Sequence, residues 1–325
     1  MKHILQRPVP SRFMRRFKDY GLPIAILMGI VFYPWLSLLS GTIPYMIVCM
    51  LFFTFLKLRP RDMHLSLVHT ILAAIQIVLA LGSYYLLSPF FPESVAQGAF
   101  NCFLCPAASA SPVIIGMLGG NIAVGTAYVL LTSLGIAFVG PLLFSLVGDG
   151  SIPFWESAST IFAHVLPIVI TPLILAWGMR YTLPRAHSKL CKYTSISFWV
   201  WIIALAIIIA KTVAFMAEEP ASEIPTMLLL IVVGLMACLL QFAIGKILST
   251  IFLKESITLG QSLGQKNSSL AIWMAQVYLN PLSSVAMAAY SIWQNLINSL
   301  QLMRESRKQT QNNNRKPHKL YGTNG

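Results

Sequence analysis

Residues 260–269 read GQSLGQKNSS, and this polar stretch lies inside a run of the chain that is otherwise long and apolar. A second stretch, residues 102–112, reads CFLCPAASASP and places Pro106 and Pro112 in the middle of another apolar run. A proline removes a backbone donor and frees a carbonyl, so two of them open a helix locally. We therefore expect two helices that are interrupted near their centres.

The composition of the chain indicates the environment of these helices. The chain has 325 residues, of which 56% are hydrophobic and 10% are charged, and its mean hydropathy is +0.72. A soluble domain carries about 25% charged residues, so this chain has too little polar surface to cover itself in water. The net charge of +13 does not indicate nucleic-acid binding, because the basic residues lie mostly between the apolar runs. The sequence predicts a membrane protein.

Ten membrane-spanning helices are expected, since about 20 apolar residues cross a bilayer and a lipid-exposed backbone must satisfy its own hydrogen bonds. The fold class is therefore all-α. The expected spans are 21–39, 43–57, 65–87, 94–117, 122–147, 155–180, 195–217, 226–248, 256–279 and 281–303. They form one transporter domain over 21–303, between an N-terminal tail (1–20) and a polar C-terminal tail (304–325) that is expected to be disordered.

Charge predicts the orientation of the spans. One alternate set of connections contains basic residues such as Arg59 and Arg185, whereas the other set contains acidic residues such as Glu93 and Glu218 and no Lys or Arg. Because basic connections stay on the cytoplasmic side, both termini are expected in the cytoplasm, as an even number of spans requires. The predicted location is the inner or plasma membrane.

The two interruptions fall in the fourth and ninth of the ten spans. Non-helical backbone at bilayer depth is tolerated only where it is buried in protein or lines an aqueous cavity. Interrupted helices at matching places in two halves indicate the binding site of a secondary transporter. Each half contains five spans, an odd number, so the second repeat (155–303) is expected to be inverted relative to the first (21–147).

Four stretches resemble the bile acid:sodium symporter family in order and spacing. They are FPESVAQGAFNCFLCPAASAS (91–111), GGNIAVGTAYVLLTSL (119–134), GQKNSSLA (264–271) and NPLSSVAMAAYSIWQN (280–295). The resemblance implies ten helices, with helices 4 and 9 crossing at their unwound centres in a core domain. It also implies that helices 1, 2, 6 and 7 form a separate panel domain.

The family couples uptake of organic anions to two sodium ions, and the resemblance assigns the ligand positions. Here these positions are Gln76, Ser111, Pro112, Gly125, Val129, Ser262 and Lys266. The glutamate that both sodium sites share becomes Ser262, and a ligand glutamine becomes Lys266. Hard cations require several oxygen ligands, so losing the carboxylate leaves only weak dipoles. We therefore expect transport without sodium, and no cofactor.

The positions that resemble the family's substrate contacts remain polar: they are Ser109, Asn267, Gln294 and Asn295. The N-termini of half-helices would place partial positive charge in the cavity, and Lys266 adds a full charge. The expected partner is thus a small or amphipathic organic anion, such as a bile-acid-like, steroid or carboxylate compound, next to membrane lipid.

Lys266 allows two interpretations. A cation near the bilayer centre costs about 2.5–3.5 kcal/mol, so Lys266 either functions as a built-in cation or caps main-chain carbonyls at the crossing. Three other functions are also considered: a proton-coupled symporter that uses Lys266, a non-transporting anion sensor and a membrane-embedded enzyme. No catalytic motif supports an enzyme, and Cys102 and Cys105 form C-x-x-C without a second pair, so no metal site is expected.

Overall fold

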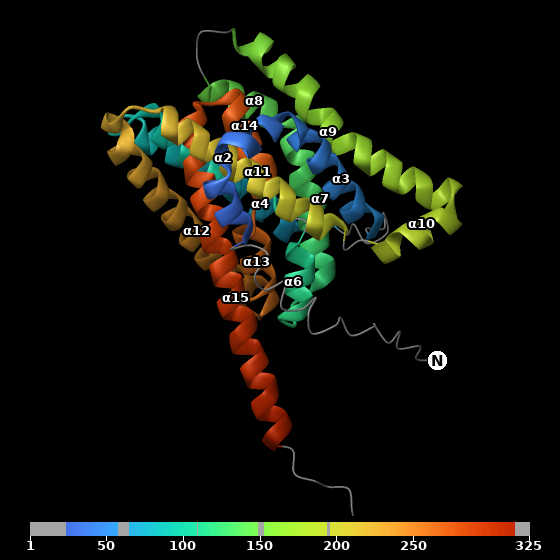
Figure 1. Ribbon diagram of the computed structural model, residues 1–325. Coiled ribbons are helices and arrows are strands. Elements are labelled where there is room, and N and C mark those ends of the chain that lie inside the picture. Colours follow the sequence, from blue (N-terminus) through green and yellow to red (C-terminus); the bar gives the residue numbers. More distant parts are fainter. Residues whose placement is uncertain (1–23, 58–64, 109, 149–152, 194–195, 316–325) are drawn as a thin grey trace, which may run out of the picture.

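The computed structural model describes residues 24–57, 65–108, 110–148, 153–193 and 196–315 (Figure 1). Over these ranges the chain is helical and forms no strand, apart from an isolated antiparallel bridge between Ala107 and Lys266. The expectation of an all-α fold is confirmed. The expected N-terminal tail and the last ten residues of the chain lie outside the described residues.

The longer helices are α3 (Ile43–Lys57), α4 (Leu67–Leu87), α5 (Glu93–Leu104), α7 (Ile122–Phe138), α9 (Phe154–Thr182), α11 (Ile196–Glu218), α12 (Ile224–Leu253), α14 (Ser268–Tyr278) and α15 (Ser284–Arg315). The shorter elements are α2 (Tyr33–Leu36), η1 (Ser37–Thr42), α6 (Ser111–Met117), α8 (Gly140–Val147), α10 (Pro184–Leu190), η3 (Cys191–Tyr193), η4 (Ala221–Glu223), α13 (Thr258–Gly264) and η5 (Pro281–Ser283). Residues 24–31 are also helical.

Within the described residues, four helical segments are long and apolar enough to cross a membrane. They are Tyr33–Leu56, Leu67–Leu87, Phe154–Thr182 and Ala221–Leu253. The pair α7 and α8, which is bent by 56°, adds a fifth if it counts as one span. A helix needs about 20 residues to cross a bilayer. The half-helices α5, α6, α13 and α14 are each shorter than this, so length alone does not identify them as parts of membrane spans. The count of ten spans therefore stays a prediction.

Large apolar side chains cover much of the outer surface. Leu38, Tyr45, Phe90 and Trp155 are between 74% and 80% exposed, and many Leu, Ile and Val side chains on the longer helices are also exposed. Such extended apolar surface is unfavourable in water and favourable against lipid. With the long apolar helices, it makes the chain compatible with a multi-pass membrane protein.

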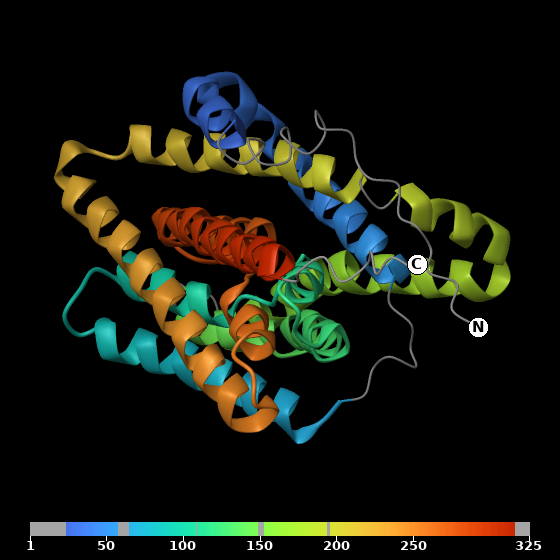
Figure 2. The same cartoon turned by 90° about the horizontal axis from the view of Figure 1, so that it is seen from below.

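The helices form two groups that contact each other. In one group α3 packs against both α9 and α11, and α11 also contacts α2. In the other group α4 packs on α5, α12 packs on α13, and α5, α12 and α14 all contact α15. Viewed from below, α15 runs between α11 and α12 (Figure 2). The groups meet where α9 contacts α7 and α8, and where α14 contacts α3 and α11.

Glycines allow α12 to approach its neighbours closely. A Cβ atom on Gly234 would lie 2.3 Å from the main-chain oxygen of Ala286 on α15, and a Cβ on Gly245 would lie 2.4 Å from that of Leu259 on α13. Small residues at such positions let helix backbones touch, which is a common packing mode of membrane helices.

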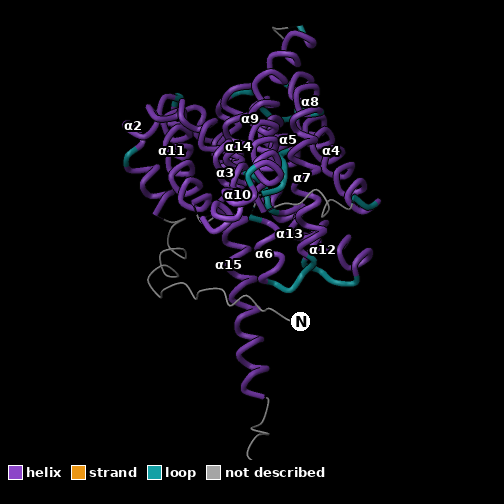
Figure 3. The backbone as a smooth tube through the Cα atoms, turned by 90° about the vertical axis from the view of Figure 1, so that its right-hand side faces the viewer, coloured by secondary structure: helices purple, strands orange, loops and turns teal. Residues whose placement is uncertain are grey.

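Helix α15 corrects one expectation. The polar tail was expected to be disordered from residue 304, but α15 continues as one helix to Arg315 and extends beyond the other helices (Figures 1 and 3). Once a helix has formed, each added residue gains a backbone hydrogen bond without a new nucleation cost. Since Ser284–Arg315 contains no Gly or Pro, nothing in this segment interrupts the helix.

Candidate functional site at the helix crossover

Two helices are interrupted, and their interruptions meet. The first lies between α5 and α6 and the second between α13 and α14, where the tube in Figure 3 changes from helix to loop. Ala108 N donates to Gln265 O at 2.9 Å, and Asn267 N donates to Pro106 O at 2.8 Å. These bonds flank the bridge between Ala107 and Lys266. The two interruptions lie together, as expected, and the residues in each interruption bond to backbone groups of the other.

Lys266 lies at the centre of this crossover and is fully buried. Its Nζ donates to the main-chain oxygen of Phe103, at the C-terminal end of α5, at 3.1 Å. Its own backbone is held by Gln294 of α15, whose Oε1 accepts from Lys266 N at 2.8 Å and whose Nε2 donates to Lys266 O at 3.3 Å. The ammonium therefore faces the negative end of a helix dipole.

Gln76 of α4 caps the next two carbonyls of the same helix end. Its Nε2 donates to Leu104 O at 2.6 Å and to Cys105 O at 2.9 Å, and its Oε1 accepts from the hydroxyl of Tyr128 at 2.7 Å. The last four carbonyls of a helix have no partner within the helix, so a buried helix end needs donors from elsewhere. All hydrogen-bonding atoms of the Gln76 amide group are thus used by the protein itself.

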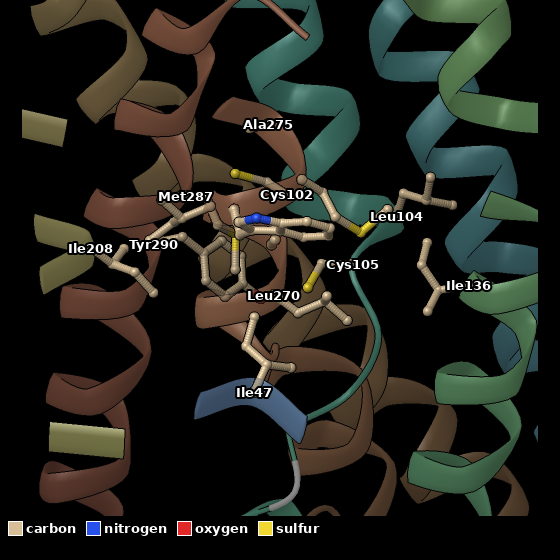
Figure 4. Packing of buried hydrophobic residues seen from close by; sticks show 14 of the residues in the cluster. Ile47, Cys102, Leu104, Cys105, Ile136, Ile208, Leu270, Ala275, Met287 and Tyr290 are labelled. Atoms are coloured by element: carbon tan, nitrogen blue, oxygen red, sulfur yellow. The ribbon is translucent and has the colours of Figure 1, made fainter. Parts of the chain in front are cut away.

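Gln241 and Tyr290 also donate to main-chain carbonyls at the ends of the broken helices. Gln241 Nε2 donates to Cys102 O at 3.1 Å, so donors from three other elements cap the four successive carbonyls that begin at Cys102. The hydroxyl of Tyr290 donates to Gly264 O at 2.8 Å, at the end of α13. Figure 4 shows Tyr290 in the same buried cluster as Cys102 and Cys105. The thiols are free, and Cys105 Sγ donates to Asn267 O at 3.1 Å.

The α6 and α13 half-helices are also tied together. The Ser111 hydroxyl is buried and donates to Gln261 O at 3.0 Å, near the C-terminal end of α13. Ser262 is equally buried, but its hydroxyl donates to Thr258 O, one turn earlier in its own helix, at 2.8 Å. Both hydroxyls therefore donate to the protein backbone.

The other positions that match sodium ligands in the resembled family lie in apolar surroundings. Gly125 lies near Ser262, but the space that a side chain would occupy is filled by Ile115 Cδ1, 2.3 Å from an ideal Cβ. Val129 is buried in an apolar cluster with Tyr128, and Pro112 is buried at the start of α6. Carbonyl and hydroxyl groups remain near the crossover, whereas no carboxylate comes from these positions.

The residues that resemble substrate contacts differ in burial and in hydrogen-bond partners. Gln294 is buried and holds the Lys266 backbone, as described above. Asn267 is half-buried, and its Oδ1 caps α14 by accepting from Leu270 N at 3.4 Å. Asn295 is half-buried, and its Nδ2 donates to Ser291 O in its own helix at 2.7 Å. Ser109 lies outside the described residues. Asn267 is thus partly accessible at the crossover itself.

Sequence reasoning missed Tyr128, Gln241 and Tyr290. Gln241 carried a usable signal, because it is a lone amide in the middle of the apolar helix α12, and a buried amide needs a partner. The hydroxyls of Tyr128 and Tyr290 gave no signal, since tyrosines are common in apolar helices. Only their positions in the fold bring them to the crossover.

The chain is similar in sequence to a bacterial transporter. It is an uncharacterized sodium-dependent transporter of Bacillus subtilis (strain 168), YocS, which is 26% identical over 235 residues, or 71% of this chain and 69% of the relative. No protein-family model matches the chain. The similarity to a transporter, together with the long apolar helices, supports a transporter in a membrane and is consistent with a non-enzyme.

Proposed function

We propose that this protein is a secondary transporter that carries a small or amphipathic organic anion across the inner or plasma membrane by alternating access, without sodium. The observation that carries the proposal is the buried Lys266 ammonium, 3.1 Å from the Phe103 carbonyl at the crossover of two broken helices. A negatively charged substrate complements the positive charge of Lys266, and we expect a bile-acid-like, steroid or carboxylate anion.

Lys266 replaces a bound cation in this proposal. In the sodium-coupled family that the sequence resembles, a bound ion would offset the negative ends of the broken helices and the carboxylate of the site. Here the carboxylate position is Ser262, and the amino group of Lys266 lies against the end of α5. Gln76, Ser111 and Ser262 use their polar groups on protein atoms. A fixed positive charge in a site of low dielectric attracts an anion and repels a second cation.

The helix contacts divide most of the described helices into two groups, which would move relative to each other during alternating access. The first contains α2, α3, α9 and α11, and corresponds to a panel; the second contains the two broken helices with α4, α7, α8, α12 and α15, and corresponds to a core. The pairing of α4 with α5 repeats as the pairing of α12 with α13, as expected for two inverted five-helix repeats in a ten-helix fold. We assign both termini to the cytoplasm.

Two hydrogen bonds connect these groups at the C-terminal end of α14. Gln276 Nε2 donates to Thr212 Oγ1 of α11 at 3.3 Å, and the Tyr278 hydroxyl lies 3.2 Å from His164 Nδ1 of α9. By the charge pattern, this end faces away from the cytoplasm. Alternating access would break these bonds, at a modest cost of about 1 kcal/mol each.

Flux into proteoliposomes tests the proposal. The full-length protein is reconstituted, and uptake of labelled cholate, a steroid sulfate and a simple carboxylate is measured in sodium and in choline buffers. We expect uptake of at least one anion that is indifferent to sodium and lost in Lys266→Gln. Lys254→Gln, which removes an exposed charge outside the crossover, is the matched control and should transport normally.

Other outcomes overturn the proposal in distinct ways. Uptake that rises steeply and saturably with sodium contradicts the built-in cation. Transport of organic cations alone contradicts the substrate class. Anion-dependent thermal stabilisation without flux would identify a sensor, and uptake that needs a pH gradient would identify proton coupling through Lys266.

A further inference from the structure

A second charged feature lies away from the crossover, at the elbow formed by residues 180–193. The elbow comprises the last three residues of the apolar helix α9, which ends at Thr182, together with the short helix α10 and the turn η3. In Figure 2 it lies at the edge of the molecule, where α9 turns back into α10. None of its side chains belongs to the proposed transport site.

One face of the elbow is fixed to the end of α3. Arg180 Nη2 donates to Leu56 O at 2.7 Å, and His187 Nε2 lies 3.0 Å from the same oxygen. Cys191 Sγ approaches it to 3.7 Å. A C-terminal carbonyl of α3 therefore collects three side chains from the elbow, and these contacts, with the half-buried Leu190, set its orientation.

The opposite face carries three exposed cations in one row. Arg185, Lys189 and Lys192 are spaced four and three residues apart, which places them on one side of a helix. Apolar and aromatic side chains flank this row. Tyr181, Leu183 and Tyr193 are exposed by 69%, 57% and 60% respectively.

Among the described residues, the helices that pack against this row carry no carboxylate near it. The sequence contains no Asp or Glu between Glu156 and Glu218. The helices packed against α10 are α3, which has no acidic residue, and α9, whose Glu156 lies at its opposite end. The three cations thus form an uncompensated basic row within the part of the chain that the structure describes.

We propose that the elbow binds the headgroups of anionic phospholipids in the leaflet next to the C-terminal end of α9. Tyrosine and leucine side chains lie favourably at the boundary between headgroups and acyl chains, and Lys and Arg side chains beside them attract anionic headgroups. The row starts three residues after an apolar span, so it lies at headgroup depth rather than out in solution. This position and the flanking apolar side chains favour lipid over a soluble anion.

Lipid titration of the purified full-length protein tests this proposal. Dioleoyl-phosphatidylglycerol or dioleoyl-phosphatidylcholine is added to the protein in a neutral detergent, and bound lipid is counted by native mass spectrometry. The test variant is Arg185→Gln with Lys189→Gln, and the matched control is Lys254→Gln with Arg304→Gln, which removes two exposed charges elsewhere. We expect the test variant to bind phosphatidylglycerol about tenfold more weakly and the control to bind it like the native protein.

Thermal unfolding in the same detergent provides the second readout. Phosphatidylglycerol should raise the Tm of the native protein and the control more than that of the test variant, whereas inorganic phosphate should have no effect. The proposal is overturned if the test variant binds phosphatidylglycerol like the control, if phosphatidylcholine binds equally well, or if inorganic phosphate gives the same shift. Because no transport is measured, its failure would leave the proposed function untouched.

Discussion

The ammonium of Lys266 lies 3.1 Å from the main-chain oxygen of Phe103, although these residues are 163 positions apart in the chain. The contact joins the break of one helix to the end of another. It agrees with the interpretation in which Lys266 caps a main-chain carbonyl at the crossover, and the role of Lys266 as a built-in cation stays a proposal. Four tests concern the interactions around this centre and the packing that supports it.

Replacing Lys266 by Met should destabilise the protein. The change leaves the Phe103 carbonyl buried without its donor, and an unsatisfied buried polar group costs about 1–3 kcal/mol. Thermal unfolding in detergent measures the loss. Lys254→Met serves as the control, because Lys254 is exposed and should tolerate the change. Equal unfolding temperatures for the native protein and Lys266→Met would mean that the contact contributes nothing to stability.

Gln76 and Tyr128 should show coupled effects. Tyr128→Phe removes the donor to Gln76 Oε1, whereas Gln76→Leu removes the donor to two carbonyls of α5. When two residues belong to one buried hydrogen-bond network, the loss of stability in the double variant usually differs from the sum of the two single losses by about 0.5–3 kcal/mol. Unfolding of both single variants and the double variant completes the cycle. Additive losses would contradict a shared network.

Two glycine substitutions should change the stability of the protein in opposite directions. Gly234→Ala places a methyl group 2.3 Å from the Ala286 oxygen, so α12 and α15 must separate, at a cost of about 1–3 kcal/mol. Gly82→Ala, in the exposed part of α4, meets no atom within 4 Å and should stabilise the helix by about 0.5–1 kcal/mol. Both are measured by thermal unfolding. A Gly234→Ala protein as stable as Gly82→Ala would contradict the close helix packing.

Glu255, in the connection between α12 and α13, should make stability depend on pH. Burial raises its pKa, but hydrogen bonds from Thr258, Ile257 and Ser249 outweigh this effect and hold the pKa below its usual value. A lowered pKa contributes stability that is present above the usual glutamate pKa of about 4.3 and is lost as pH falls through the folded pKa. The Tm of the native protein should therefore fall more steeply than that of Glu255→Gln as the pH falls below about 5.

The control for this measurement is Glu218→Gln, at the exposed end of α11. It should lose stability with falling pH just as the native protein does. If Glu255→Gln and the native protein follow the same pH curve, the hydrogen bonds to Glu255 do not favour its ionised form.

The sequence by itself determined the helical class, the membrane environment and the places where two helices break. These features depend on local chemistry: apolar runs require lipid or a core, Pro106 and Pro112 cannot continue a regular helix, and residues 260–269 are too polar for contact with lipid. The meeting of the two breaks could also be expected, because each break exposes backbone groups that need partners.

Only the tertiary structure decided which side chains satisfy those groups. Tyr128, Gln241 and Tyr290 reach the crossover from helices that are distant in the chain, and no spacing rule links them to their partners Gln76, Cys102 and Gly264. Their selection depends on which helix faces pack together, and this depends on many apolar contacts at once. For the same reason, the three side chains that converge on the Leu56 carbonyl become visible only when α9 folds back against α3.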